Sequence, residues 1–115
     1  MKVRDIQSEF NLELAAGSRG LDRDVSDGYC GDLLSDVIAN AGSGAIWLTI
    51  QSHQNIVAVA ALKDLAAIVL VNGHRPDDGT RAKAEEEGIP LLLSSESSYR
   101  LAGKLFCAGI DLTAV

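Results

Sequence analysis

Two histidines and an arginine are the residues of this sequence best suited to chemistry near neutral pH. His53 and His74 each follow a short apolar run, and Arg75 comes directly after His74. Imidazole titrates near neutrality, and a guanidinium binds carboxylates and phosphates. If both apolar runs are parallel strands, their carboxyl ends meet at one edge of a sheet, where ligands bind in such folds. The candidate ligand-binding residues at this edge are Thr49, Gln51, His53, Asn55, Asn72, His74 and Arg75.

A second interpretation of these loops stays open. Ser, Asn and Gly are the usual residues of turns, and Ser or Asn side chains also cap the free N–H groups at the start of a helix. The pattern therefore fits either helix capping or a small-molecule site. Arg75 favours an anionic or phosphorylated ligand for such a site.

Apolar strands that alternate with helices position these loops. In the second half, the pattern predicts strands over 45–50, 67–71 and 89–93, and helices over 54–65, 77–87 and 97–107, the last one capped by Ser94 or Ser95. In the first half, it predicts helices over 3–10 and 33–40 and strands over 12–15 and 25–29. The fold class is therefore α/β, with three layers: a mainly parallel sheet and helices on both faces. No linker divides the chain, so residues 1–115 are expected to form one domain.

The helix over 33–40 carries further expectations. Asp32 precedes it and is a suitable N-cap residue. Its spacing predicts that the apolar side chains turn inward, namely Leu33, Leu34, Val37, Ile38 and Ala41.

Composition narrows the function classes. The 115 residues include 16 acidic and 10 basic side chains, a net charge of −6, which argues against nucleic acid or an anionic membrane as partner. Cys30 and Cys107 have no metal-ligand spacing and are expected to be reduced core thiols. The apolar runs are too short for a membrane span and no signal segment follows Met1, so we expect a cytoplasmic protein.

Catalytic signatures are missing from the sequence. It contains no GxxxxGK[ST] phosphate loop, no GxGxxG after a strand, no GxSxG elbow and no HExxH zinc motif. We therefore predict no catalytic residue, no metal and no cofactor.

The helix after Asn55 points to a partner chain. The segment Ile56–Leu62 is apolar on all sides, and such a helix is normally buried all round. A small domain has little material to cover it, so we predict a homodimer with Ile56–Leu62 at or near the interface.

Four stretches together resemble the DRTGG domain, in particular its small stand-alone bacterial form. They are GYCGDLLSDV (28–37), WLTIQSHQNIVAVA (47–60), AIVLVNGHRPD (67–77) and GIPLL (88–92). Val71-Asn72-Gly73 stands where relatives often have Thr-Gly-Gly. The resemblance implies a regulatory module, since similar domains occur in bacterial phosphotransacetylases and between the CBS domains of some family-II pyrophosphatases.

The sequence thus supports a non-catalytic regulatory or binding domain that acts as a homodimer. Its partner is a small anionic metabolite or nucleotide, or another protein. Two alternatives remain: a small enzyme with His53 or His74 as acid–base, and a purely structural dimerisation module.

Overall fold

The computed structural model describes residues 1–110, and within them five strands form one sheet in the order β1-β5-β4-β3-β2. Four strands run parallel: β2 (Asp27–Cys30), β3 (Ala45–Thr49), β4 (Ala67–Leu70) and β5 (Leu91–Leu93). β1 (Glu13–Ala16) is antiparallel to β5 and forms one edge of the sheet. The predicted mainly parallel α/β class is confirmed.

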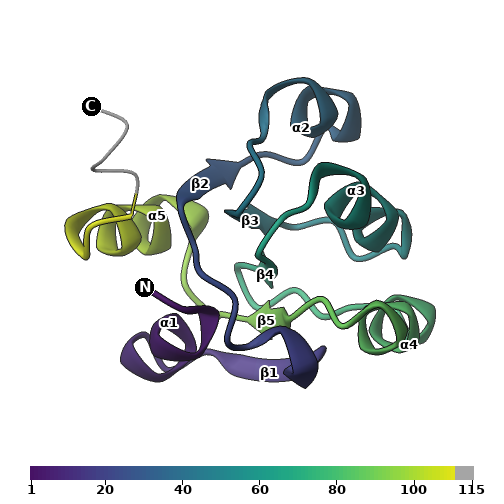
Figure 1. Ribbon diagram of the computed structural model, residues 1–115, viewed down its shortest axis with the longest axis horizontal. Helices are drawn as coiled ribbons and strands as arrows, with labels where there is room; N and C mark the ends of the chain where they lie inside the picture. The colour runs from purple at the N-terminus through teal and green to yellow at the C-terminus, as the bar shows by residue number, and fades with distance from the viewer. Residues whose placement is uncertain (111–115) are drawn as a thin grey trace.

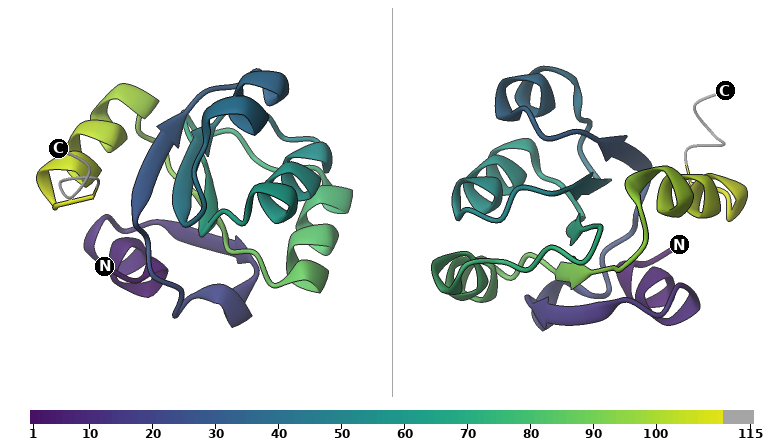
Figure 2. Two further views of the ribbon diagram at one scale, coloured as in Figure 1. Left: turned by 45° about the horizontal axis from the view of Figure 1, so that its top comes forward. Right: turned by 180° about the vertical axis from the view of Figure 1, so that it is seen from behind.

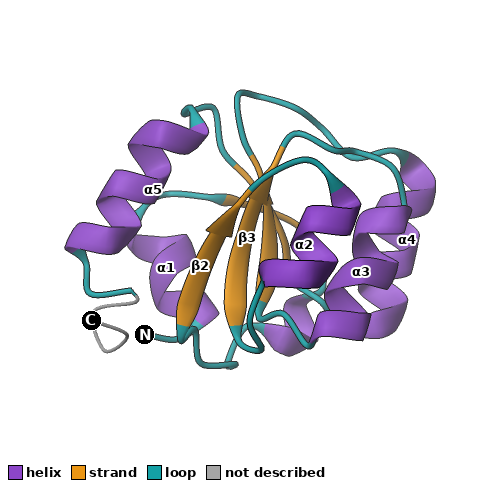
Figure 3. Cartoon of the chain, turned by 90° about the horizontal axis from the view of Figure 1, so that it is seen from above, coloured by secondary structure: helices purple, strands orange, loops and turns teal. Residues whose placement is uncertain are grey.

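Helices cover both faces of the sheet, which gives the three predicted layers. α2 (Leu34–Asn40), α3 (Asn55–Lys63) and α4 (Asp78–Glu87) pack on one face, and α1 (Val3–Glu9) and α5 (Ser98–Cys107) pack on the other (Figures 1 and 3). A single 3-10 turn, η1 (Ser18–Gly20), follows β1 within the described chain. Each face of the sheet has its own apolar cluster, because each strand directs alternate side chains to opposite faces.

The central strands are buried from both sides. Every residue of β3 and β4 is buried, including Trp47, whose indole N–H donates to the carbonyl of Gly31 at 2.8 Å. Continuous apolar runs are typical of parallel strands with helices on both faces. The two central strands therefore form a rigid base that holds the loops after Thr49 and Leu70 at the same edge, at the top of Figure 3.

Gly17 shows how tightly the β1 edge is joined to α4. Its φ of 80° lies in the left-handed region, and an added Cβ would lie 1.9 Å from the carbonyl oxygen of Ile89. Its N–H donates to the Glu85 carboxylate at 3.0 Å. Only glycine allows this close approach.

The start of α2 differs from the prediction. Leu33, not Asp32, occupies the N-cap position, and no side chain caps the helix. The Asp32 carboxylate turns instead toward the end of β3, where it accepts two hydrogen bonds. Leu33 (68% exposed) and Ile38 (40% exposed) face outward, because α2 packs on the sheet mainly through Val37.

Three further expectations need correction. The last helix is capped by Ser97, whose Oγ accepts from the N–H of Arg100 at 3.2 Å, rather than by Ser94 or Ser95. Cys30 and Cys107 are exposed and are not core thiols, because Cys30 lies on the edge strand β2 and Cys107 on the outer side of α5.

The apolar helix α3 is covered only in part. Ile56, Val57, Val59 and Ala60 are buried between the sheet and the neighbouring helices, whereas Leu62 is 70% exposed. Figure 2 shows α3 between α2 and α4 in the same layer. No helix of the described chain is long and apolar enough to cross a membrane.

Candidate functional site

The loop after β3 is held in place by Asp32. One carboxylate oxygen accepts from the Thr49 hydroxyl at 2.8 Å and from the Ile50 N–H at 2.9 Å. The side-chain amide of Gln51 donates to the Asp32 carbonyl at 2.9 Å. Thr49 is almost fully buried, and its hydroxyl also accepts from the Gln51 N–H at 3.2 Å. Thr49 and Gln51, two of the predicted ligand residues, thus make hydrogen bonds within the protein.

His53 serves the start of α3. Its Nδ1 accepts from the N–H of Asn55 at 3.1 Å, and its carbonyl accepts from the N–H of Ile56. The first N–H groups of a helix have no partner within the helix, so a side-chain acceptor here stabilises it. His53 acts as the cap that the alternative interpretation anticipated.

Ser52 joins this loop to α4. Its carbonyl accepts from the hydroxyl of Thr80 at 2.6 Å and from the N–H of Asp77 at 3.1 Å. Thr80 is fully buried. The loop after β3 and the start of α4 are therefore in direct contact.

The loop after β4 turns toward β5. Asn72 has a φ of 58°, a left-handed conformation that asparagine tolerates. Its N–H donates to the Glu96 carbonyl at 2.8 Å, and the Gly73 N–H donates to the Ser94 carbonyl at 3.0 Å. These bonds place the next residues, His74 and Arg75, beside the loop after β5.

A polar groove of about 450 Å³ opens at this edge. Four segments line it: the turn between α1 and β1, the loop after β4, the loop after β5, and the middle of α5. The lining residues are Phe10, Asn11, Glu13, Gly73, His74, Arg75, Leu93, Ser94, Ser95, Glu96 and Lys104. Its position at the carboxyl ends of β4 and β5 is where open α/β sheets bind ligands.

Two ion pairs border the groove. Arg75 donates to Glu13 at 3.0 Å, and Lys104 to Glu96 at 2.5 Å. Both basic groups are about half exposed, so water screens the pairs and an anion can compete for them. The His74 side chain makes no hydrogen bond to any residue of the described chain. The groove therefore offers two cations and one free imidazole.

The structure divides the seven predicted residues into two groups. His74 and Arg75 line the groove, with Asn72 in the turn that precedes them. Thr49, Gln51, His53 and Asn55 belong to the loop after β3 and do not line it. Sequence reasoning placed Ser94 and Ser95 at this edge but missed Glu13 and Lys104, which reach it only through the antiparallel β1 and the opposite face of the sheet.

Other titratable groups of residues 1–110 do not form a metal site, since no group of three His, Cys, Asp or Glu side chains is arranged to hold an ion. Burial, and secondarily the charge of Asp32, raises the pKa of the Cys30 thiol, which keeps it protonated. A hydrogen bond to Asp36 raises the pKa of Tyr29 to about 12. Neither group is activated as a nucleophile.

Comparisons with known proteins give a match in fold. No family model and no curated protein matches the sequence. Among solved structures, the chain is similar to the CBS and DRTGG domains of the regulatory region of Clostridium perfringens pyrophosphatase, complexed with the activator diadenosine tetraphosphate. The TM-score is 0.74 at 12% identity, over 89% of this chain and 44% of that one. The chain thus spans less than half of that structure, and the similarity supports a DRTGG-like fold.

Proposed function

We propose that this chain is a non-catalytic regulatory domain that binds a small anionic ligand, such as a nucleotide or an acyl phosphate, and acts as a homodimer. The observation that carries the proposal is the fold, which is similar to a regulatory region solved with a nucleotide activator. The groove at the carboxyl edge gives a place for such a ligand. The domain is expected to comprise residues 1–115 and to be cytoplasmic.

The groove suits an anion of moderate size. Arg75 and Lys104 reach it from opposite sides, and their partners Glu13 and Glu96 hold them there before a ligand arrives. A phosphate can replace either carboxylate as the partner of the same cation. Phe10 offers an aromatic surface at the end of the groove. Gln51, His53, Asn55 and Asn72 stay predictions as ligand contacts.

A thermal-shift screen with ATP, ADP, diadenosine tetraphosphate and acetyl phosphate tests the proposal. We expect one class of probe to raise the melting temperature of the wild type, and Arg75→Ala to weaken its binding at least tenfold. Arg81→Ala is the matched control, because Arg81 is exposed on α4 and lies outside the groove. Equal losses in both variants would indicate unspecific attraction of anions and would contradict the site.

Two outcomes favour the alternatives. Turnover of a probe that depends on His53 or His74 indicates an acid–base enzyme. A dimer that binds none of the probes indicates a structural dimerisation module. The sequence predicts the contact of the homodimer at Ile56–Leu62, of which Ala58, Ala61 and Leu62 are exposed in the structure.

A further inference from the structure

The outer face of α5 carries an apolar strip that the monomer leaves uncovered. Tyr99 is 89% exposed and Phe106 is 50% exposed, and between them lie Ala102 and Gly103. Residues three, four and seven positions apart share one face of a helix. The four side chains form a continuous surface, here named the α5 strip, on the side of the helix opposite to the buried Leu101 and Leu105.

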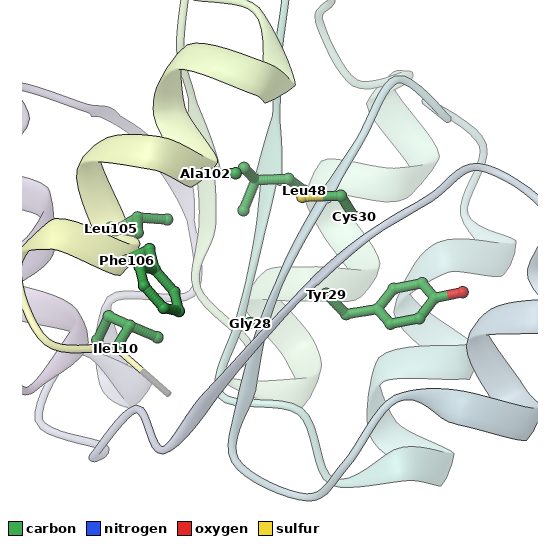
Figure 4. Close-up of a pocket in the computed structure, with 8 residues that line it drawn as sticks. All are labelled: Gly28, Tyr29, Cys30, Leu48, Ala102, Leu105, Phe106 and Ile110. Carbon is green, nitrogen blue, oxygen red and sulfur yellow. The ribbon is translucent and has the colours of Figure 1, made fainter. Parts of the chain in front are cut away.

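The strip borders a wide apolar groove. About 820 Å³ of space lies along α5, and Cys30 of the edge strand β2 forms part of its wall. A smaller apolar cavity of about 130 Å³ lies behind it between α5 and β2 (Figure 4). Phe106 lines both spaces, while the Tyr29 side chain points away from the cavity, toward the other face of the sheet.

Gly103 has no role in the fold of the monomer. An added Cβ would meet no atom within 4 Å, and its φ is not in the left-handed region. A glycine within an exposed helix makes that helix less stable than alanine does. A residue that costs stability and packs against nothing inside the chain allows another backbone to approach closely from outside.

We propose that the α5 strip is the contact face of the homodimer, with the two copies of α5 crossing antiparallel at Ala102 and Gly103. This inference rests on the homodimer of the proposed function and places its contact on α5 instead of α3. A two-fold axis requires a surface that is complementary to itself. The strip meets this requirement, because an axis midway between Ala102 and Gly103 brings Tyr99 opposite the partner's Phe106.

The charges of α5 fit a second copy of this chain. The protein has a net charge of −6, so two copies repel each other over most of their surfaces. α5 contains no Asp or Glu, and Arg100 forms no ion pair within residues 1–110. Arg100 lies at the positive N-terminal end of its own helix, where a cation is unfavourable. In the antiparallel pair it lies near the negative C-terminal end of the partner helix and near an aromatic ring.

The size of the strip sets the expected affinity. Aromatic side chains bury about 150–250 Å² each when covered, so the strip alone contributes less than the roughly 800 Å² per partner of a standard interface. We therefore expect a dissociation constant in the micromolar range, with Cys30 and the edge of β2 adding area at the margin.

Sedimentation velocity of the full chain from about 1 to 500 µM tests the interface. We expect reversible dimerisation of the wild type, and at least a tenfold weaker dimer for Tyr99→Asp. Gly103→Gln gives the sharper result: a better helix former raises the melting temperature of the monomer while the longer side chain blocks the crossing. Leu62→Asp is the matched control on α3, since Leu62 is 70% exposed, and it should dimerise like the wild type.

A symmetric cross-link gives an independent measurement. In a chain with Cys30→Ser and Cys107→Ser, Gly103→Cys should oxidise readily to a covalent dimer, and Leu62→Cys should not. The inference is wrong if Gly103→Gln dimerises like the wild type, or if Leu62→Asp alone dissociates the dimer, which would leave the homodimer intact with its contact on α3. A wild type that stays monomeric at 500 µM removes both the α5 contact and the homodimer, while the ligand screen still tests the binding function.

Discussion

The loops after β3 and β4 have similar compositions but different roles. Each contains a histidine, an asparagine and further polar side chains, and each lies at the carboxyl edge of the sheet. In the loop after β3, Thr49, Gln51 and His53 all make hydrogen bonds within the protein. In the loop after β4, the backbone N–H groups make those bonds, and His74 and Arg75 extend into a groove. Polar residues at a strand end therefore indicate a site only when the backbone, rather than the side chains, holds the loop.

The comparison predicts its largest effect at Asp32. Asp32→Ala removes the acceptor of the Thr49 hydroxyl and the Ile50 N–H, which should lower the free energy of unfolding by about 2 kcal/mol. Urea denaturation measures this change. Asp32→Asn is the control, because its amide oxygen can still accept, and it should cost less than Asp32→Ala. Binding of a probe in the groove should be unchanged; a loss of binding at native conditions would show that the two loops are coupled.

The two histidines give the next largest difference. His53→Ala removes the acceptor for the Asn55 N–H and should lower the free energy of unfolding by about 1 kcal/mol, the usual effect of a lost cap. His74→Ala should change it by less than about 0.5 kcal/mol, as for an exposed side chain without partners. The same denaturation experiment measures both. If the two substitutions have equal effects on stability, the distinction between the loops is wrong.

The sequence predicted the sheet and its layers because those depend on periodicity. Continuous apolar runs marked β3, β4 and β5 as parallel strands between helices, and Gly88 marked the end of α4. Asp32 was assigned to the wrong partner because capping is a local rule, whereas its actual partners, Thr49 and Ile50, lie on a neighbouring strand. A local pattern cannot show which of two suitable acceptor positions a carboxylate takes.

The groove was predicted only in part for a similar reason. The strand-end rule brings His74, Arg75, Ser94 and Ser95 to one edge, but it does not show which loops face each other. The antiparallel pairing of β1 with β5 brings Glu13 beside Arg75, 62 positions away in the chain. Lys104 reaches the groove from α5 through its ion pair with Glu96.

A charged pair at the opposite edge of the sheet gives a purely structural reference with a smaller effect. Asp64, after α3, accepts from Arg23 at 2.8 Å and from the Ser43 hydroxyl at 2.6 Å, and these contacts lower its pKa to about 2 from 3.8. Because the folded pKa is lower than the unfolded one, this carboxylate stabilises the fold above about pH 4 and ceases to do so as the pH falls toward 2.

Asp64→Asn should therefore be less stable than the wild type at pH 6, and the difference should shrink between pH 4 and pH 2. Thermal melts at pH 6, 4 and 2.5 measure it, with Asp24→Asn as an exposed control near the same edge. A difference that stays constant over this range would contradict the assignment. No probe of the groove should bind differently to this variant.

The pair Arg75–Glu13 should have the smallest effect on stability and the largest on binding. Both side chains are more than half exposed, at 60% and 56%, and such pairs contribute at most about 1 kcal/mol. Arg75→Ala and Glu13→Gln should therefore have nearly the same stability. Their effects on an anionic probe should be opposite, because Arg75→Ala removes the cation while Glu13→Gln removes its competitor and should strengthen binding several-fold. Isothermal titration with the best probe of the screen measures both. If both substitutions weaken binding equally, the ion pair holds the shape of the groove and Arg75 does not contact the ligand.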